Sequence, residues 1–310
     1  SDLTDIKWDG LVERFSAPPQ EKRRAPFHIL SPVSSNLTHD DYARAFRKIR
    51  GYIHDGDCYQ VNLAQRFSAT ASGDPWLAYQ RLRIINPAPF SAYLNTPYAQ
   101  ILSASPERFL KLEGVRVETR PIKGTRPRAG HARLDAELVE ALLASEKDRA
   151  ENLMIVDLLR NDLSKNCALG TVKVPKLFDV ESFATVHHLV STVTGELRPD
   201  RDALDLLRGF FPGGSITGAP KLRAMQIIEE LEPHRRGVYC GAIGYVGFDG
   251  NMDVNIAIRT LVHSQGAIRF WAGGGIVADS KLEDEYQETF DKAAALLKLL
   301  QQSAASQTGA

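Results

Sequence analysis

Apolar residues recur at helical spacing in several stretches of the chain. Over residues 40–54, Tyr42, Phe46, Ile49 and Ile53 share one face, which is typical of an amphipathic helix. Similar patterns predict helices over 75–85, over most of 134–163, and over 202–210, 219–231 and 280–300. Pro220 suits the first turn of the helix over 219–231, and Ser280 with Glu283 has the spacing of a capping box.

Runs of apolar and β-branched residues predict strands between these helices. The ranges are 59–68, 90–94, 100–103, 186–197, 238–246, 254–262 and 267–271. We expect the last three to be neighbours in one antiparallel sheet. Residues 109–112 and 115–119 flank Glu113-Gly114, which predicts a hairpin. Because helices and strands do not alternate as regular βαβ units, the pattern favours an α+β fold.

The pattern divides the chain into three parts. Residues 1–35 form an N-terminal extension, in which the Pro-, Lys-, Arg- and Ser-rich stretch 16–35 is interpreted as a linker. Residues 36–302 form the main domain, and residues 303–310 a flexible tail. The first ten residues are polar and do not resemble a signal peptide. No apolar run approaches the roughly 20 residues that a membrane helix needs.

Charge and cysteine content narrow the function classes. Acidic and basic residues balance at 38 each, so no net charge draws the chain to nucleic acid or to an acidic membrane. Cys58, Cys167 and Cys240 are odd in number and form no CxxC pair, which favours the reducing cytoplasm over disulfides or zinc. Cys240 lies in a pattern typical of a buried strand, and we do not expect it to be a glutaminase nucleophile.

One lysine stands in a bend where a strand should end, in the sequence TRPIKGTRPRAG (119–130). Pro121 cannot donate to a ladder and Gly124 frees the backbone, so the strand end can open toward a ligand. The simplest hairpin register places Glu107 opposite Arg120, with Lys123 about 10 Å further along.

A nucleophilic lysine must be neutral, and lowering its pKa from 10.4 to near 7 takes roughly 4–5 kcal/mol. Burial and the nearby arginines, Arg120, Arg126 and Arg128, could supply part of this. The alternative is a surface lysine in a basic turn.

Acidic residues and glycines gather in WAGGGIVADSKLEDEYQETFDKA (271–293). The three glycines, Gly273, Gly274 and Gly275, could present N–H groups to an anion as a nest, or form a flexible turn. Glu285, Glu288 and Lys292 share one polar helix face, which is either solvated or part of a Mg²⁺ site. Glu151, in KDRAENLMIVDLLRND, could add a third carboxylate or merely pair with Lys147.

Two further segments contain candidate binding groups. FPGGSITGAPK (211–221) lacks the GxxxxGK[ST] spacing of a phosphate loop. Its glycines nevertheless precede a helix, with Thr217 nearby, and this arrangement suits a carboxylate or phosphate. His187 and His188 are adjacent and must face opposite sides of an extended segment. The inward one is either a core histidine or a site residue.

Taken together, these motifs occur in one order: SPERF (105–109), RPIKGTRPR, KDRAENLMIVDLLRNDL, FPGGSITGAPK, GAIGYVG, IAIRTL and AGGGIVADS…EYQETFDKA. The chain resembles the chorismate-utilising enzymes over roughly residues 27–300. The resemblance implies an anthranilate synthase component I-like fold, with antiparallel sheets sandwiched and flanked by helices. It also makes residues 36–302 the chorismate-binding catalytic domain.

The resemblance further implies a mechanism. Mg²⁺ would hold the ring carboxylate of chorismate through Glu151, Glu285 and Glu288. Lys123 would attack C2 as the 4-hydroxyl leaves, with Glu107 as general acid/base. Ammonia would then attack C4, giving 4-amino-4-deoxychorismate for p-aminobenzoate and folate synthesis. His188 matches an active-site histidine. The positions matching substrate-binding residues are Thr217, Tyr245, Arg259, Gly273, Gly274, Gly275 and Lys292.

Two positions favour amination through a covalent lysine adduct. The anthranilate synthases that resemble this stretch carry alanine in PIAGT, where this chain has Lys123. The isochorismate and salicylate synthases carry a water-activating lysine where this chain has Gln60. Ammonia is expected from solution or from a separate glutamine amidotransferase subunit. The alternatives are another chorismate amination, such as anthranilate formation, or an inactive binding subunit, because family members usually carry a further N-terminal segment.

Overall fold

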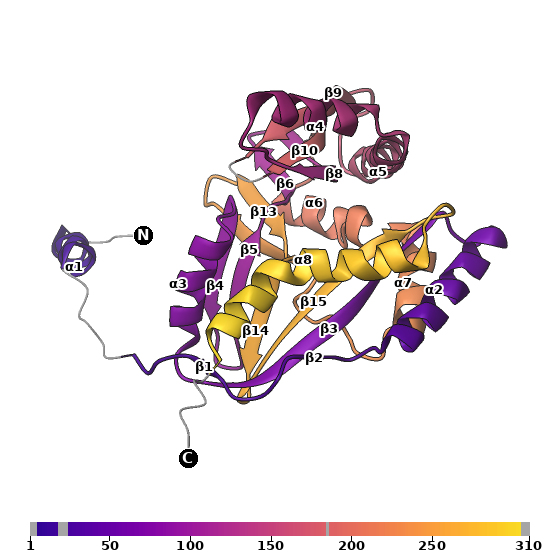
Figure 1. Cartoon of the computed structure of the whole chain (residues 1–310). Helices are drawn as coiled ribbons and strands as arrows, with labels where there is room; N and C mark the ends of the chain where they lie inside the picture. Colours follow the sequence, from indigo (N-terminus) through magenta and orange to yellow (C-terminus); the bar gives the residue numbers. More distant parts are fainter. Residues whose placement is uncertain (1–4, 18–23, 184–185, 305–310) are drawn as a thin grey trace, which may run out of the picture.

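The computed structural model describes residues 5–17, 24–183 and 186–304. Two antiparallel sheets form its framework (Figure 1), and the expected α+β class is confirmed. The first sheet has the order β1-β3-β15-β14-β5-β4, with β2 and β11 also paired to β3. Its strands are β1 (His28–Ile29), β2 (Ser34–Ser35), β3 (Gln60–Ser72), β4 (Phe90–Asn95), β5 (Gln100–Ser105), β11 (Gly218–Ala219), β14 (Thr260–Ser264) and β15 (Ala267–Ile276).

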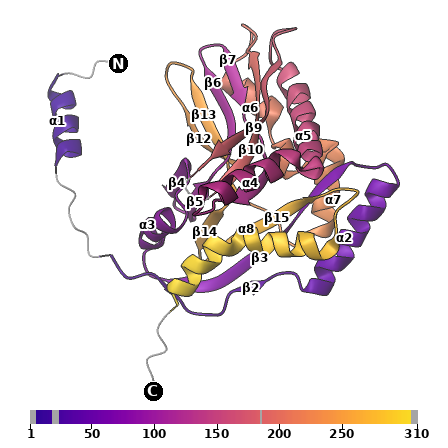
Figure 2. The same cartoon turned by 45° about the horizontal axis from the view of Figure 1, so that its top comes forward.

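The second sheet has the order β12-β13-β6-β7-β10-β8, with β9 paired to β10. Its strands are β6 (Arg108–Glu113), β7 (Arg116–Thr119), β8 (Ile122–Pro127), β9 (Lys173–Ser182), β10 (Val186–Glu196), β12 (Ala242–Val246) and β13 (Met252–Ile256). Figure 2 shows the hairpins of this sheet standing above the first sheet.

Helices cover the outer faces of both sheets. α8 (Leu282–Gln302) lies across β15 and β3, with α2 (His39–His54) and α7 (Lys221–Leu231) at one end and α3 (Pro75–Ile85) near the other (Figures 1 and 2). α4 (Ala132–Ala144) and α5 (Glu146–Ser164) pack on β8 and β10. The remaining helices are α1 (Asp5–Ser16), α6 (Ala203–Phe210) and the short 3₁₀ turn η1 (Gly214–Ile216).

Local sequence explains why α2 begins where it does. The Thr38 hydroxyl accepts a hydrogen bond from the Asp41 N–H at 3.2 Å, and the Asp41 carboxylate accepts one from the Thr38 N–H at 3.0 Å. This reciprocal capping box satisfies two donors that the first turn leaves free. The predicted apolar face is confirmed, because Tyr42, Phe46 and Ile49 are buried.

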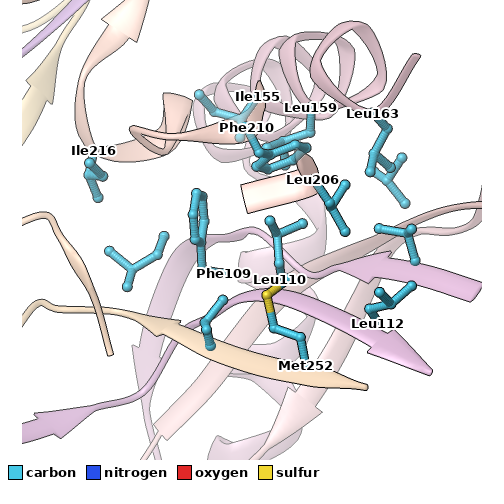
Figure 3. Packing of buried hydrophobic residues seen from close by; sticks show 14 of the residues in the cluster. Phe109, Leu110, Leu112, Ile155, Leu159, Leu163, Leu206, Phe210, Ile216 and Met252 are labelled. Carbon is cyan, nitrogen blue, oxygen red and sulfur yellow. The ribbon is translucent and has the colours of Figure 1, made fainter. Parts of the chain in front are cut away.

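The largest core lies between the second sheet and helices α5 and α6. Figure 3 shows side chains of these elements meeting there, including Phe109 and Leu110 of β6, Ile155 of α5 and Phe210 of α6. The rings of Phe109 and Phe210 pack edge to face, with centroids 5.4 Å apart. This core fixes α5 against the sheet and therefore fixes Glu151 on that helix.

The expectation that 238–246, 254–262 and 267–271 share one sheet is wrong. β12 and β13 belong to the second sheet, whereas β14 and β15 belong to the first. The predicted strand 254–262 breaks between Ile256 and Thr260. At the break Arg259 has φ +49, which a β-strand does not allow. The chain therefore crosses from one sheet to the other at Arg259.

Three predicted helix boundaries also differ from the structure. Lys281 occupies the N-cap position of α8 without a side-chain capping hydrogen bond, and Ser280 donates to Glu285 Oε1 at 2.6 Å, so the expected capping box does not form. Gly218–Ala219 is the strand β11, and the helix begins at Lys221. The stretch 134–163 is two helices, because Ser145 ends α4 and caps α5 by accepting from the Asp148 N–H.

Part of the predicted linker belongs to the first sheet. β1 and β2 pair with β3, and Phe27 is buried, while residues 18–23 lie outside the described residues. Of the predicted tail, Ser303 is buried and its carbonyl accepts a hydrogen bond from the Ile29 N–H at 2.7 Å. Residues 305–310 lie outside the described residues. No helix in the described ranges is long and apolar enough to cross a membrane.

Candidate active site

The β6–β7 hairpin brings Glu107 beside Lys123. Glu113 pairs with Arg116, so the turn is Gly114-Val115 and the register differs by two residues from the simple expectation. Continued to the strand ends, this register brings Glu107 level with Ile122, next to Lys123. The expected pairing of Glu107 with Arg120 is wrong, and Arg120 instead forms an ion pair with Glu181 of β9.

Lys123 lies in a β-bulge of β8. His188 pairs with Thr125 and Val190 with Ile122, so Lys123 and Gly124 together oppose the single residue Leu189. Bulges bend a strand and re-aim a side chain. Gly124 has φ +81, and a Cβ there would lie 2.9 Å from side-chain atoms of both Asp148 and Leu142. Glycine is therefore required for the bulge. The strand was expected to open at its end, and the structure has the bulge at Lys123 and Gly124 in that place.

Carboxylates from three elements surround the amine of Lys123. Burial raises the pKa of Glu107, and the charge of Lys123 opposes that rise. Burial also raises the pKa of Glu151, again opposed by Lys123. Burial would also raise the pKa of Glu288. The charges of Lys292, whose Nζ lies 2.5 Å from Glu288 Oε1, and of Lys123 outweigh burial and lower this pKa. Glu107, just before β6, and the two glutamates of α5 and α8 therefore all lie within the range of the Lys123 charge.

Arg259 and His188 join the same group of charges. Burial lowers the pKa of Arg259, and the negative charge of Glu107 opposes this. Burial and the positive charge of Arg259 lower the pKa of His188 to about 4, so this imidazole is neutral at pH 7. The Nδ1 atom of His188 lies 2.9 Å from the Thr125 hydroxyl, which fixes the ring beside the bulge. His187, the other histidine, is buried as well, with its Nε2 2.9 Å from Asp135 Oδ1, so the expectation that only one of the two faces the interior is wrong.

The three glycines form part of strand β15 and not a nest or a turn. Their partners on β3 are Ala64, Leu63 and Asn62, in that order. The N–H groups of Asn62 and Ala64 point away from β15, to the Thr217 carbonyl and the Glu232 carboxylate.

In an antiparallel ladder, residue pairs that exchange hydrogen bonds alternate with pairs that do not. Gly273 and Gly275 belong to the second kind, so they direct their N–H and C=O groups away from β3, to the other edge of β15. β14 begins only at Thr260, opposite Trp271, so in the described residues no strand covers the edge beside these glycines. Lys292 Nζ donates to the Gly273 carbonyl there at 3.2 Å. The N–H groups of both glycines therefore point to an open strand edge and not into a nest, and their binding of an anion stays a prediction.

Two carboxylates of α8 lie close to Gly274, on the face of β15 to which a side chain at this position would point. A Cβ at this position would lie 3.0 Å from Glu285 Oε2 and 3.0 Å from Glu288 Oε1. At Gly275 a Cβ would lie 2.8 Å from the Gln60 amide nitrogen. The glycines thus let charged and polar side chains approach the strand on both faces.

The acidic group has features that suit a divalent cation. Glu285 is buried, and its Oε2 has no hydrogen-bond partner. Burial raises its pKa, the Ser280 hydroxyl counters the rise, and the charges of Glu288 and Glu151 add to it. Repulsion among buried carboxylates with an unpaired oxygen is relieved by a cation. Oxygen donors of this kind are those that Mg²⁺ prefers.

The carboxylates are not arranged as a closed metal site. Across the described ranges, no three His, Cys, Asp or Glu side chains are gathered closely enough to hold an ion. Instead, lysines stand beside them: Lys147 Nζ lies 3.8 Å from Glu285, and Lys292 pairs with Glu288. Glu151, Glu285 and Glu288 would therefore have to exchange lysine contacts for metal contacts.

The glycine-rich loop 211–221 supplies polar groups on the inner side of β3. Ser215, which the sequence analysis did not select, donates to Glu107 Oε1 at 3.4 Å. Thr217 is buried, but its hydroxyl already donates to the Gly213 carbonyl at 2.9 Å, so only its lone pairs remain for a ligand. Gln60 is fully buried, and neither of its amide atoms has a partner.

Tyr245 does not belong to this group. Its side chain is 66% exposed on β12, a strand at the sheet edge. The buried tyrosine of the same motif is Tyr239, whose ring stacks on Trp271, two residues before Gly273. Tyr239 is a residue of the hydrophobic core, and the assignment of Tyr245 to substrate binding stays a prediction. Burial raises the pKa of Cys240 to about 11, which fits its expected lack of a nucleophilic role.

Comparison with known proteins is consistent with this arrangement. The profile of a family described as chorismate binding enzyme matches residues 4–298. Aminodeoxychorismate synthase component 1 of Escherichia coli K12 is 56% identical over 91% of this chain and 62% of its own length. Anthranilate synthase component 1 of Aquifex aeolicus is 48% identical, over 88% of this chain and 55% of its own.

The fold also matches a solved structure. The crystal structure of anthranilate synthase component I from Streptococcus pneumoniae aligns with a TM-score of 0.82 and 37% identity, covering 94% of this chain and 65% of that one. The anthranilate synthase component I-like fold expected from the motifs is confirmed. The chain spans about three fifths of the length of the E. coli relative.

Proposed function

Because the chain belongs to the family of chorismate binding enzymes, we propose that it aminates chorismate to 4-amino-4-deoxychorismate, as an aminodeoxychorismate synthase component 1. The observation that carries the proposal is Lys123. The bulge at Gly124 sets the direction of the Lys123 side chain. The positive charge of its amine interacts with Glu107, Glu151 and Glu288.

The three arginines expected to keep this amine neutral pair instead with Glu181, Asp148 and Asp135. The proton of the amine would therefore pass to a buried carboxylate whose pKa burial raises, Glu107 or Glu151, before the amine attacks the ring.

The proposed chemistry has two substitutions. The Lys123 Nζ forms a bond to C2 of the ring, both conjugated double bonds shift, and the C4–O bond breaks. The departing hydroxyl takes a proton from Glu107 and leaves as water. Ammonia then forms a bond to C4, both double bonds shift back, and the C2–Nζ bond breaks, while the ionised Glu107 takes the proton that ammonia loses. Glu107 suits the acid role because burial raises its pKa and favours its protonated form.

Other residues would bind the substrate's carboxylates. The N–H groups of Gly273 and Gly275 face an open strand edge, and Arg259 is a half-buried cation within the range of the Glu107 charge. His188, neutral at pH 7, can donate or accept a hydrogen bond near the reacting ring.

We propose that Glu151, Glu285 and Glu288 hold a Mg²⁺ ion. When bound, the ion would neutralise and orient a ring carboxylate. The support is the mutual repulsion of the three groups and the unpaired Glu285 oxygen. Lys147 and Lys292 would be released from Glu285 and Glu288 as the ion enters.

We further propose that ammonia is delivered by a separate glutamine amidotransferase subunit, and that the protein works in the cytoplasm. The word "component" in the relative's name supports a second subunit. The three cysteines are free and buried, which suits a reducing compartment.

The deciding experiment is a product assay with chorismate, Mg²⁺ and ammonium. We expect 4-amino-4-deoxychorismate, identified by mass and absorbance after separation. Anthranilate is the second candidate product, favoured by the relative from A. aeolicus, and its appearance would replace the proposal. Chorismate binding without turnover would indicate a binding subunit and would contradict the proposal.

A further inference from the structure

We propose that the Asn152 carboxamide and the Ser191 hydroxyl act as a positioning pair, which fixes the Lys123 bulge against the helix that carries Glu151. Asn152 follows Glu151 on α5, and Ser191 lies on β10, two residues beyond the Leu189 that opposes the bulge. Both side chains are 0% exposed. The inference rests on the proposed role of Lys123, and it assigns to these two residues the geometry of that site.

The pair connects four segments through hydrogen bonds. Ser191 Oγ donates to Asn152 Oδ1 at 2.5 Å, and Asn152 Nδ2 donates to the Leu189 carbonyl at a longer 3.5 Å. The Ser191 N–H donates to the carbonyl of Pro121, at the entrance to β8. Ser191 Oγ also accepts from the Phe178 N–H of β9 at 3.1 Å. The Ser191 hydroxyl therefore connects α5 to β9, and the Ser191 backbone N–H connects β10 to the start of β8.

Strand β10 needs such support because its neighbours bulge on both sides. On the β8 side, Lys123 and Gly124 oppose Leu189. On the β9 side, the register shifts between the pairs Val190–Asp179 and Thr192–Lys176, and Phe178 has φ +59. A bulge leaves an extra residue outside the regular ladder. Side-chain hydrogen bonds from α5 thus reach β10 where its regular backbone ladder is interrupted.

The consequence concerns the separation of the nucleophile from the acidic group. Pro121 is two residues before Lys123, and Asn152 is one residue after Glu151. Loosening the pair would leave buried polar atoms unsatisfied and let β8 shift relative to α5. A misplacement of about 1 Å at a reacting group costs about 10²-fold in rate. Neither residue needs to touch the substrate for this effect.

The test compares Ser191→Ala with Ser103→Ala. Ser103 is also 0% exposed, and its hydroxyl lies 2.8 Å from Thr260 Oγ1 in the first sheet, so the control removes a similar buried bond away from β8. Chorismate affinity is measured by calorimetry, and the rate of the Lys123 adduct by quenched mass spectrometry without ammonia. For Ser191→Ala we expect an adduct rate about 10–100-fold lower, with chorismate affinity within about threefold. Ser103→Ala should lower the Tm comparably and keep the wild-type rate.

Two further readouts make the result decisive. The double variant Asn152→Ala/Ser191→Ala should be no slower than the slower single variant, because one unit has been broken. Acetic anhydride labelling of Lys123, with exposed Lys48 as internal reference, should be faster in Ser191→Ala than in wild type. Equal rates and equal labelling in Ser191→Ala and Ser103→Ala would overturn the inference. If the wild type forms no adduct, the proposed function fails, while the labelling comparison still tests the positioning pair.

Discussion

Substitution of Gly274 by alanine tests the acidic site with one added methyl group. The residue lies in the middle of β15, and its φ is not in the left-handed region, so alanine adds no backbone strain. The new Cβ would stand 3.0 Å from Glu285 Oε2 and 3.0 Å from Glu288 Oε1. Both carboxylates would therefore be displaced together, while their charges and the backbone stay unchanged.

The size of the effect follows from these distances. An ordinary contact to a methyl carbon begins near 3.4 Å, so each oxygen must retreat by about 0.4 Å. Metal sites tolerate deviations of only about 0.2 Å in ligand distance. Changes that disturb ligand orientation cost about 10–100-fold in metal affinity. We expect the Mg²⁺ concentration for half-maximal activity to rise by that factor, equivalent to about 1.4–2.7 kcal/mol.

The assay is a Mg²⁺ titration of chorismate amination, with urea unfolding measured on the same samples. Gly51→Ala is the matched control, since a Cβ at Gly51 in α2 would have no neighbour within 4 Å. The control should keep the wild-type titration. If Gly274→Ala also keeps it, with unfolding unchanged, the carboxylates of α8 do not hold the metal.

Three other perturbations test the geometry around this site. Gly124→Ala, at φ +81, should destabilise the fold by about 1–2 kcal/mol in urea unfolding and reduce amination; unchanged stability would contradict the bulge. Arg236 pairs with Glu232 in a buried site, so Arg236→Ala should cost about 3–5 kcal/mol in the same assay, and a loss under 1 kcal/mol would count against that ion pair. Burial and the charge of Arg259 lower the pKa of His188 from 6.5 to about 4. Between pH 6.5 and pH 4, His188 is therefore protonated in the unfolded chain but stays neutral in the native state. Stability should fall over that window by at most about 3 kcal/mol more than in His188→Gln, and parallel curves for the two proteins would show that His188 is not the cause.

Sequence reasoning succeeded where the signal was local. The apolar stripe of α2 and the order of the motifs depend on residues close together in the chain, and both gave correct results. The charge of Lys123 acts on Glu107, Glu151 and Glu288 in the structure, while the catalytic and metal-binding roles of these residues stay predictions.

The errors arose where pairing over long distances decides the outcome. The three glycines look like a turn until β3, about 200 residues earlier in the chain, pairs with them. The register at Glu107 depends on whether the turn is Glu113-Gly114 or Gly114-Val115, and the sequence allows both. The change of sheet at Arg259 follows from the packing of two sheets, which no pattern within 254–262 reveals.

The central claim is that the amine of Lys123 becomes bonded to the substrate ring. The most direct measurement is peptide mapping by mass spectrometry after the protein is mixed with chorismate and Mg²⁺ without ammonia, then acid-quenched. We predict a mass gain of chorismate less one water on the peptide that contains Lys123, and its loss on addition of ammonium. Turnover in Lys123→Ala at the wild-type rate, or an unmodified Lys123 in an enzyme that makes product, would contradict the claim.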